Sequence, residues 1–322
     1  MGEIILELMT HVLLTGAGFT RNWGGWLAKE LEGDLLARLA PHEQLRRLVQ
    51  NSENYEEALG KARSPGYSGV GVSPAQLKAL EDAIKESFWA MNMALGQRAS
   101  MYLSGESKRS ILEALPKFDA IFTLNQDLLL EFHYNAGHQP SRWIGSYYPG
   151  IEPEVATPLD AGEVVRIERK VGAIKTADSQ RQPIYKLHGS IEWVDGSGSL
   201  FVMGGSKEVY IQSKPLLRRY AEVFAEYLRR PNARLMIIGY GFADDHINRL
   251  LVEASQANPS LGFFHVHPDG RDAVHRGARE RVAIYSPPST ATLPCIGESR
   301  RLLTTTFGGD TLEFDKLMRF FA

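Results

Sequence analysis

The stretch that decides the fold is His11-Val-Leu-Leu-Thr-Gly-Ala-Gly18, in which a short apolar run ends directly in a glycine segment. Four other apolar runs of similar length also end in polar residues or glycine, at residues 120–124, 184–187, 235–238 and 263–266. Short runs without strict alternation are typical of strands that are buried on both faces. Helical patterns follow most of these runs, so we expect an α/β fold, a parallel sheet with helices on both faces.

The residues after each run are the candidates for chemistry, because open parallel sheets bind ligands at the carboxyl ends of their strands. The first run leads into Gly16-Ala17-Gly18-Phe19-Thr20-Arg21-Asn22. Glycines at this junction let backbone N–H groups approach a phosphate, and a following helix adds positive potential. Arg21 stands where a dinucleotide fingerprint has its third glycine. The segment is therefore a nucleotide loop of another kind, or simply a structural turn.

Polar side chains also follow the second and third runs. Thr123-Leu-Asn125-Gln-Asp127 comes before a helical pattern, where Asn125 would cap the helix and Asp127 would favour its positive end. Asn125 alternatively faces a ligand at the strand end. The third run leads into Leu187-His188-Gly189, and a histidine can take a proton near neutral pH because its ordinary pKa is about 6.5. The alternative for His188 is a half-buried histidine whose hydrogen bonds are satisfied.

A second glycine pair follows the fourth run, in Gly239-Tyr-Gly241-Phe-Ala-Asp244-Asp245-His246. These glycines would bring another backbone segment close to the same ligand. We expect Asp244 to cap the following helix, and acid-pair chemistry with Asp245 is the alternative.

The composition excludes several classes of protein. Lys and Arg number 36 against 38 Asp and Glu, and the net charge of −2 removes the overall electrostatic case for a nucleic-acid or membrane-surface protein. The single cysteine, Cys295, excludes an internal disulfide and a thiolate zinc site, and the spacing of His246, His265 and His267 matches no standard site, so we expect no metal. No signal-peptide pattern and no apolar segment of about 18 residues is visible, and we expect a cytoplasmic protein.

Two parts of the chain stand apart from the sheet pattern. Residues 41–112 are expected to form a helical insertion, a lid or subdomain, whose clearest helix starts at Ser73-Pro74 and carries apolar residues three or four apart from Leu77 to Leu95. Ordinary extra helices packed on the core are the alternative. Residues 286–322 are expected to form a C-terminal tail and helix, with irregular chain at 286–309 and a helix begun by Asp310.

Three shorter predictions concern the connections. Residues 63–71 are expected to form a loop before the long helix, and residues 138–182 a mixed region with turns. The Gly/Ser cluster at 195–199 is expected to join two short strands.

The four strand-end segments, in this order, resemble the sirtuin (silent information regulator) superfamily. The marks of its sirtuin-like branch are a G-A-G loop, a T-x-N-x-D strand end, an L-H-G segment and a G-Y-S-F-x-D-type turn. Here they stand at residues 16–18, 123–127, 187–189 and 239–244. The resemblance implies one catalytic domain, residues 1–322, with a Rossmann-like fold that takes NAD+ as substrate and breaks its nicotinamide–ribose bond.

The resemblance also implies roles for individual residues. Asn125 and His188 would be the catalytic pair, and Asp127 would help to hold the nicotinamide carboxamide. Loss of nicotinamide leaves an oxocarbenium-like ribosyl cation, so the site needs orienting groups and a base rather than a strong nucleophile. The residues implied to bind NAD+ are Gly16, Ala17, Gly18, Phe19, Asn22, Thr123, Asp127, Gly239, Gly241 and Asp244.

The cysteine count points to one branch of this superfamily. Its deacylases carry a module with four zinc-binding cysteines, which one cysteine cannot supply. The chain therefore looks like the NAD+ hydrolases of bacterial anti-phage defence, which deplete NAD+. The alternatives are a deacylase or ADP-ribosyltransferase that uses the same cleavage, and a non-enzymatic module that senses NAD+ or ADP-ribose.

A freely active NAD+ hydrolase would poison its host, so the resemblance also implies control. We expect a homo-oligomer or a regulatory partner, such as a HerA-type ATPase or a short Argonaute. We expect no membrane partner, and nucleic acid only indirectly.

Overall fold

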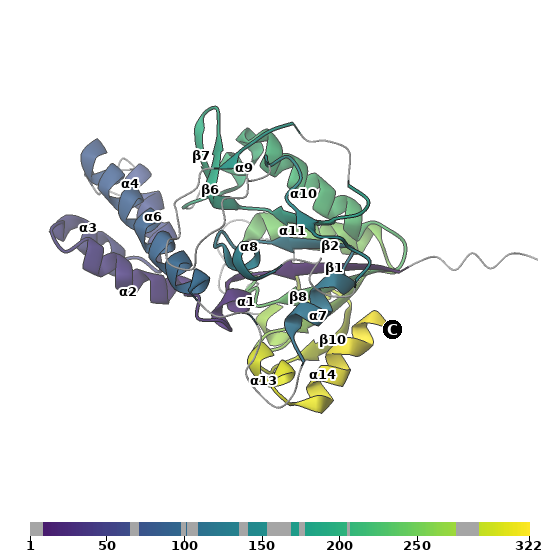
Figure 1. Cartoon of the computed structure of the whole chain (residues 1–322). Helices are drawn as coiled ribbons and strands as arrows, with labels where there is room; N and C mark the ends of the chain where they lie inside the picture. Colours follow the sequence, from purple (N-terminus) through teal and green to yellow (C-terminus); the bar gives the residue numbers. More distant parts are fainter. Residues whose placement is uncertain are drawn as a thin grey trace, which may run out of the picture.

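A seven-stranded parallel sheet forms the centre of the computed structural model (Figure 1). The structure describes residues 9–64, 71–97, 101, 109–134, 141–152, 169–173, 178–204, 207–274 and 290–322. The strand order is β10-β9-β8-β1-β2-β5-β3. The bounds are β1 Thr10–Thr15, β2 Ala120–Thr123, β3 Ser146–Tyr147, β5 Gln182–Lys186, β8 Ala233–Ile238, β9 Gly262–Val266 and β10 Cys295–Ser299. All five predicted runs are adjacent strands of this sheet, which confirms the Rossmann-like α/β prediction.

Strand β1 is central because it is buried on both faces and paired on both edges. Val12 pairs with Ala120 of β2 and with Leu235 of β8, and Leu13 and Leu14 are, like Val12, fully buried. Successive side chains of a strand point to opposite faces. Accordingly, Leu13 belongs to the apolar cluster on one face, and Val12 and Leu14 belong to the cluster on the other.

Helices cover both faces of the sheet, as predicted. Helices α10 (Pro215–Leu228) and α11 (Asp245–Ala257) contribute to the cluster that contains Val12 and Leu14. The opposite cluster includes residues of α7 (Ile111–Ala114), α8 (Leu129–His133), α13 (Leu303–Phe307) and α14 (Thr311–Met318). In Figure 1, α10 lies above the sheet, and α7, α13 and α14 lie below it.

Four further helices stand together beside the sheet (Figure 1): α2 (Ala28–Arg38), α3 (Glu43–Gln50), α4 (Tyr55–Arg63) and α6 (Pro74–Gly96). The predicted N-cap of α6 is confirmed, since Ser73 Oγ accepts from Gln76 N and the Gln76 side chain accepts from Ser73 N. Its apolar stripe is buried from Leu80 to Leu95. Although α6 has 23 residues, no described helix combines the length and apolar character needed to cross a bilayer.

A second, small sheet starts directly after His188. Strands β6 (Gly189–Asp195) and β7 (Gly198–Phe201) form an antiparallel pair, and β4 (Arg169–Lys170) adds to β6. The prediction that the Gly/Ser cluster joins two short strands is confirmed. Helix α9 (Lys207–Ser213) lies next in the chain.

The prediction of irregular chain at 286–309 is wrong over two stretches, and its positions 286–289 lie outside the described residues. Residues 295–299 form β10, and residues 303–307 form α13. The sequence of β10, Cys-Ile-Gly-Glu-Ser, has no strand pattern of its own, and the strand forms because it pairs with β9 at the edge of the sheet. The final helix begins as predicted, since Asp310 Oδ1 accepts from Glu313 N.

The two predicted connecting segments, residues 138–182 and 63–71, are described only in part by the structure. The mixed region contains the edge strand β3, and part of it lies outside the described residues. The predicted loop at 63–71 starts at the last residue of α4, and its positions 65–70 also lie outside the described residues.

Shortening a side chain in β1 tests how far stability depends on this strand. Leu13→Ala should lower the free energy of unfolding by about 2–5 kcal/mol, because it opens a cavity at a fully buried position. Leu312→Ala is the matched control, since Leu312 is 81% exposed, and should change the free energy by less than about 0.5 kcal/mol. Urea unfolding followed by circular dichroism measures both, and equal effects would contradict the assignment of β1 to the core.

Candidate functional site

A cavity of about 870 Å³ lies at the carboxyl ends of the parallel strands. It is lined by the segments that follow β1, β2, β8 and β9, and by His188 in the turn between β5 and β6. The structure therefore brings together most of the site residues that were predicted from the sequence. Those lining the cavity are Gly16, Ala17, Gly18, Asn22, Asn125, Asp127, His188, Gly239, Gly241 and Asp244.

Two walls of this cavity come from parts of the chain in which sequence reasoning found no site residue. One wall comes from α4, α6 and the segment before α2, and it includes Trp26, Tyr55, Phe88 and Met91. The other comes from residues 301–304, before and within α13. Phe88 and Met91 belong to the apolar stripe of α6, whose pattern does not distinguish a core position from a cavity wall.

The glycines have a structural reason, which is the close packing of two loops. Gly16 N donates to Ile238 O, and Gly18 N donates to Gly239 O, each at 2.9 Å. A Cβ at Gly18 would lie 2.8 Å from Gly239 Cα, and one at Gly239 (φ +66°) would lie 2.3 Å from Phe19 N. A Cβ at Gly241 would meet open space. Glycine therefore allows both loops to line the same cavity.

Asn125 is held by the loop after β1. Its Nδ2 donates to Gly16 O at 3.0 Å and to Thr20 Oγ1 at 2.8 Å. The predicted alternative, that Asn125 caps the next helix, is wrong, because α8 starts at Leu129 without a side-chain cap. Among the described residues nothing donates to Asn125 Oδ1, so this oxygen is available to a ligand in the cavity.

Thr20, which sequence reasoning missed, connects Asn125 to Asp127. Its hydroxyl accepts from Asn125 and donates to Asp127 Oδ2 at 2.9 Å. Asp127 Oδ1 accepts from Leu129 N at 3.0 Å, which agrees with the predicted place of this carboxylate at the start of the helix. Burial raises the pKa of Asp127. Lys186 also holds this turn, because its Nζ donates to the Asp127 carbonyl oxygen at 2.6 Å.

Three of the residues predicted to bind NAD+ make contacts within the loops around the cavity. Phe19 is buried against Trp23, and its side chain does not line the cavity. Thr123 is also buried outside the cavity lining, and its hydroxyl accepts from Asn125 N at 3.0 Å. Asn22 lines the cavity, but its amide donates to Gly18 O at 2.7 Å and accepts from Leu303 N at 3.0 Å.

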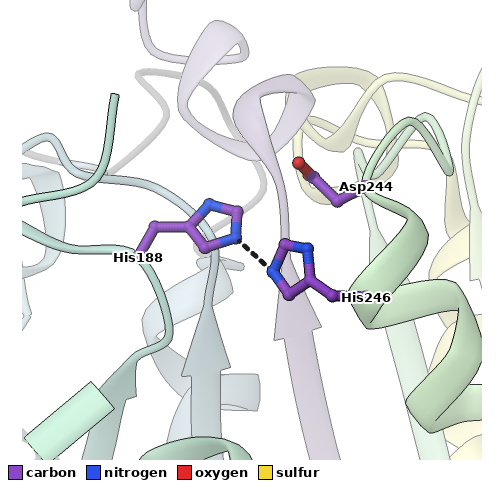
Figure 2. A group of neighbouring side chains, drawn as sticks. All are labelled: His188, Asp244 and His246. Carbon is purple, nitrogen blue, oxygen red and sulfur yellow. Dashed lines mark hydrogen bonds between the residues drawn. The ribbon is translucent and has the colours of Figure 1, made fainter. Parts of the chain in front are cut away.

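His188 and His246 form a direct contact (Figure 2). Their Nε2 atoms lie 3.0 Å apart, and His188 is 4% exposed. Burial lowers the pKa of His188 to about 3, and burial also lowers the pKa of His246. Both rings are therefore neutral near neutral pH, with one nitrogen donating and the other accepting.

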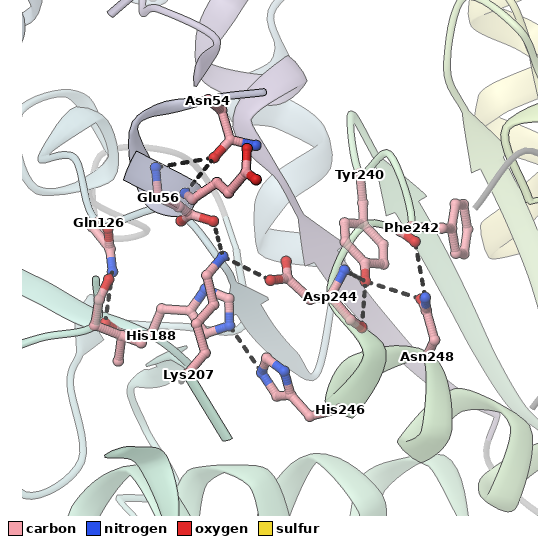
Figure 3. A network of polar contacts seen from close by, with 12 residues as sticks. Asn54, Glu56, Gln126, His188, Lys207, Tyr240, Phe242, Asp244, His246 and Asn248 are labelled. Atoms are coloured by element: carbon pink, nitrogen blue, oxygen red, sulfur yellow. Dashed lines mark hydrogen bonds and ion pairs between the residues drawn. The ribbon is translucent and has the colours of Figure 1, made fainter. Parts of the chain in front are cut away.

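Asp244 occupies the N-cap position of α11, but the prediction that its side chain caps this helix is wrong. Lys207 Nζ donates to Asp244 Oδ1 at 2.7 Å and lies 2.8 Å from Glu56 Oε2 (Figure 3). The charge of the ammonium attracts the carboxylate more strongly than a neutral backbone N–H. Burial alone would raise the pKa of Asp244, but the neighbouring imidazoles and Lys207 outweigh burial and hold this pKa below its ordinary value.

The side chains of His188, Asp244 and His246 also raise the question of a metal. Among the described residues these three offer ligand atoms that all lie within 4.8 Å of one another. No spacing rule reveals this group, because His188 and His246 are 58 positions apart. The Lys207 ammonium already neutralises Asp244, and the imidazoles already bond to each other. In the structure these side chains therefore belong to a network of hydrogen bonds and charges.

Together, the fold and the site define an α/β protein of Rossmann-like architecture with polar side chains and glycine loops around one cavity. The family model of the SIR2-like domain matches residues 119–283, just over half of the 322 residues. The chain belongs to the SIR2-like family, and the predicted membership of the sirtuin superfamily is confirmed. This membership supports an NAD+-related function. A search of the curated proteins found no match.

Adding one methyl group at each glycine of the second pair tests the loop packing. Gly239→Ala should lower the free energy of unfolding by roughly 1–3 kcal/mol or more, because the residue has positive φ and its Cβ would meet backbone atoms. Gly241→Ala, the matched control, should change it by no more than about 0.5 kcal/mol. Thermal unfolding measures both variants, and an unchanged Gly239→Ala would mean that the two loops separate easily.

Proposed function

We propose that the protein is an NAD+ glycohydrolase, which cleaves the nicotinamide–ribose bond to give nicotinamide and ADP-ribose. One observation carries this proposal: Asn125 and His188 line the same cavity as the two glycine segments. Membership of the SIR2-like family supports NAD+ as the substrate.

The cavity suits a dinucleotide in size and lining. Its volume of about 870 Å³ lies in the upper part of the range for small-molecule sites, about 300–1,000 Å³. Trp26, Phe88 and Met91 provide apolar surface for a flat ring. The glycine segments leave backbone uncovered, where a diphosphate can approach closely.

The chemistry needs two polar groups that act on ribose and water. When the bond between C1′ and the nicotinamide nitrogen breaks, its electron pair stays with nicotinamide, which leaves as a neutral molecule. Asn125 Oδ1 can accept a hydrogen bond from a ribose hydroxyl or from the attacking water. His188 takes the proton of that water as its oxygen bonds to C1′, and the proton is finally released to solvent.

The two alternative enzymes differ in the acceptor of the ribosyl group. A sirtuin-type deacylase uses an acylated lysine, and the four-thiolate module of those enzymes cannot form with Cys295 alone. An ADP-ribosyltransferase would add ADP-ribose to another molecule. A sensing module needs the glycine loops, but it does not need Asn125 and His188 together. We favour water as the acceptor for these reasons.

We also propose that the activity depletes NAD+ in anti-phage defence. The resemblance of the strand-end segments to hydrolases of that branch supports this role. Control by self-assembly or by a partner, such as a HerA-type ATPase or a short Argonaute, stays a prediction. Measuring cellular NAD+ after phage infection, with and without the His188→Ala variant, tests the role.

Purified protein incubated with NAD+ should release nicotinamide and ADP-ribose in equal amounts. The protein is assayed alone and with the product of its neighbouring gene, and chromatography measures both products. Asn125→Ala and His188→Ala should each lower kcat by about 100-fold or more, because each removes a group that acts on the reacting atoms.

Two exposed residues of the same types provide controls. His42 and Asn51 flank α3 at its two ends, away from the cavity lining, and the variants Asn51→Ala and His42→Ala should keep kcat within about twofold of the wild type. No nicotinamide in either mixture would reject the hydrolase. Nicotinamide without free ADP-ribose would favour the transferase.

A further inference from the structure

We propose that His246 is a positioning residue for His188, and that the two imidazoles act as one proton-accepting pair. This inference rests on the proposed function, because it concerns the base of the same reaction. It adds a residue from α11, which does not line the cavity, to the machinery of the site.

The two rings are placed in series between the cavity and the exterior. His188 lines the cavity from the turn after β5, whereas His246 is half-buried in the first turn of α11. Their ring centroids are 5.1 Å apart, and the rings are tilted by 41°. Figure 2 shows the two Nε2 atoms pointing toward each other. His246 therefore contacts the base without occupying substrate space.

This contact fixes the hydrogen-bonding state of His188. A neutral imidazole has one N–H donor and one acceptor nitrogen. At an Nε2–Nε2 distance of 3.0 Å, one of these nitrogens must donate and the other accept. The tautomers of the two rings are therefore coupled, and the orientation of the His188 ring is held. The backbone of Leu124 is the other hydrogen-bond partner of the His188 ring.

The charged groups around the pair favour an additional proton. Lys207 lies between the carboxylates of Asp244 and Glu56, so these three groups carry a net charge of −1 if all are ionised (Figure 3). On the outer side, Glu208 and Arg249 pair at 2.6 Å and cancel each other. A negative environment stabilises the imidazolium that forms when a base takes a proton.

The pair also gives so buried a histidine a route by which a proton can leave it. With a pKa of about 3 in this environment, His188 holds a proton weakly at neutral pH. His246 is less buried and is one hydrogen bond away. The O–H bond of the attacking water breaks, its oxygen bonds to C1′, and the proton passes to the imidazole pair and then to solvent.

The test compares two substitutions at one position. His246→Ala should lower kcat by about 10- to 100-fold and leave the KM for NAD+ within about twofold, because His246 does not line the cavity. His246→Gln keeps an amide donor without a titrating group, and should recover part of kcat. In both variants the acidic limb of the pH profile should move, because the two imidazoles no longer share a proton and the contribution of His246 to the pKa of His188 is lost.

A second measurement detects the coupling between His188 and His246 in the absence of turnover. In an NMR titration, the His188 imidazole should respond together with His246 in the wild type, and should titrate at a different pH in His246→Ala. Gln256→Ala, on the exposed part of α11, is the matched control and should change neither readout. Circular dichroism verifies that each variant is folded.

The outcomes separate this inference from the proposed function. Wild-type kcat and pH profile in His246→Ala, with His188→Ala inactive, would overturn the inference and leave the hydrolase standing. A wild type without nicotinamide release would reject the hydrolase, and with it the catalytic role of the pair. An unchanged His188 titration in His246→Ala would exclude the coupling itself. If activity is lost in EDTA and recovered on adding Zn2+, then His188, Asp244 and His246 are metal ligands, and the inference is overturned.

Discussion

The close approach of Gly18 to Gly239 is the constraint on which the site depends. It joins the loops after β1 and β8 through the 2.9 Å bond from Gly18 N to Gly239 O, and it leaves no room for a Cβ on either residue. Gly16 O, in the same loop, accepts from Asn125, and Gly18 O accepts from Asn22, which also binds the backbone of Leu303. Segments that are more than 280 positions apart in the chain are thus fixed relative to one another at the strand ends.

The sheet centre and the strand ends could be predicted from sequence because both depend on local patterns. Short apolar runs mark strands buried on two faces, and glycine or polar residues mark their ends. Strands β3 and β10 could not be predicted in this way, since two and five residues without an apolar pattern become strands only by pairing with β5 and β9.

The candidate site was predictable only in part for a similar reason. Asn125 and His188 stand in recognisable segments. Thr20 and His246, in contrast, belong to the site through a partner that is far away in the sequence: Asn125 is 105 positions from Thr20, and His188 is 58 positions from His246. Asp244 was expected to cap a helix because its neighbours in sequence suggest it. Its actual partner, Lys207, is 37 positions distant, and no local pattern shows that ion pair.

The ion pair between Lys207 and Glu56 links α4 to the charged and polar groups at the cavity. Glu56 lies in the first turn of α4, and its carboxylate is one of the two that balance the ammonium of Lys207. If α4 withdrew from Lys207, the charge beside the imidazoles would change from −1 to zero, and their affinity for a proton would fall. Thermodynamic linkage makes this effect reciprocal, so protonation of the imidazoles strengthens the docking of α4. The packing of α4 and the proton affinity of the imidazoles are in this way coupled.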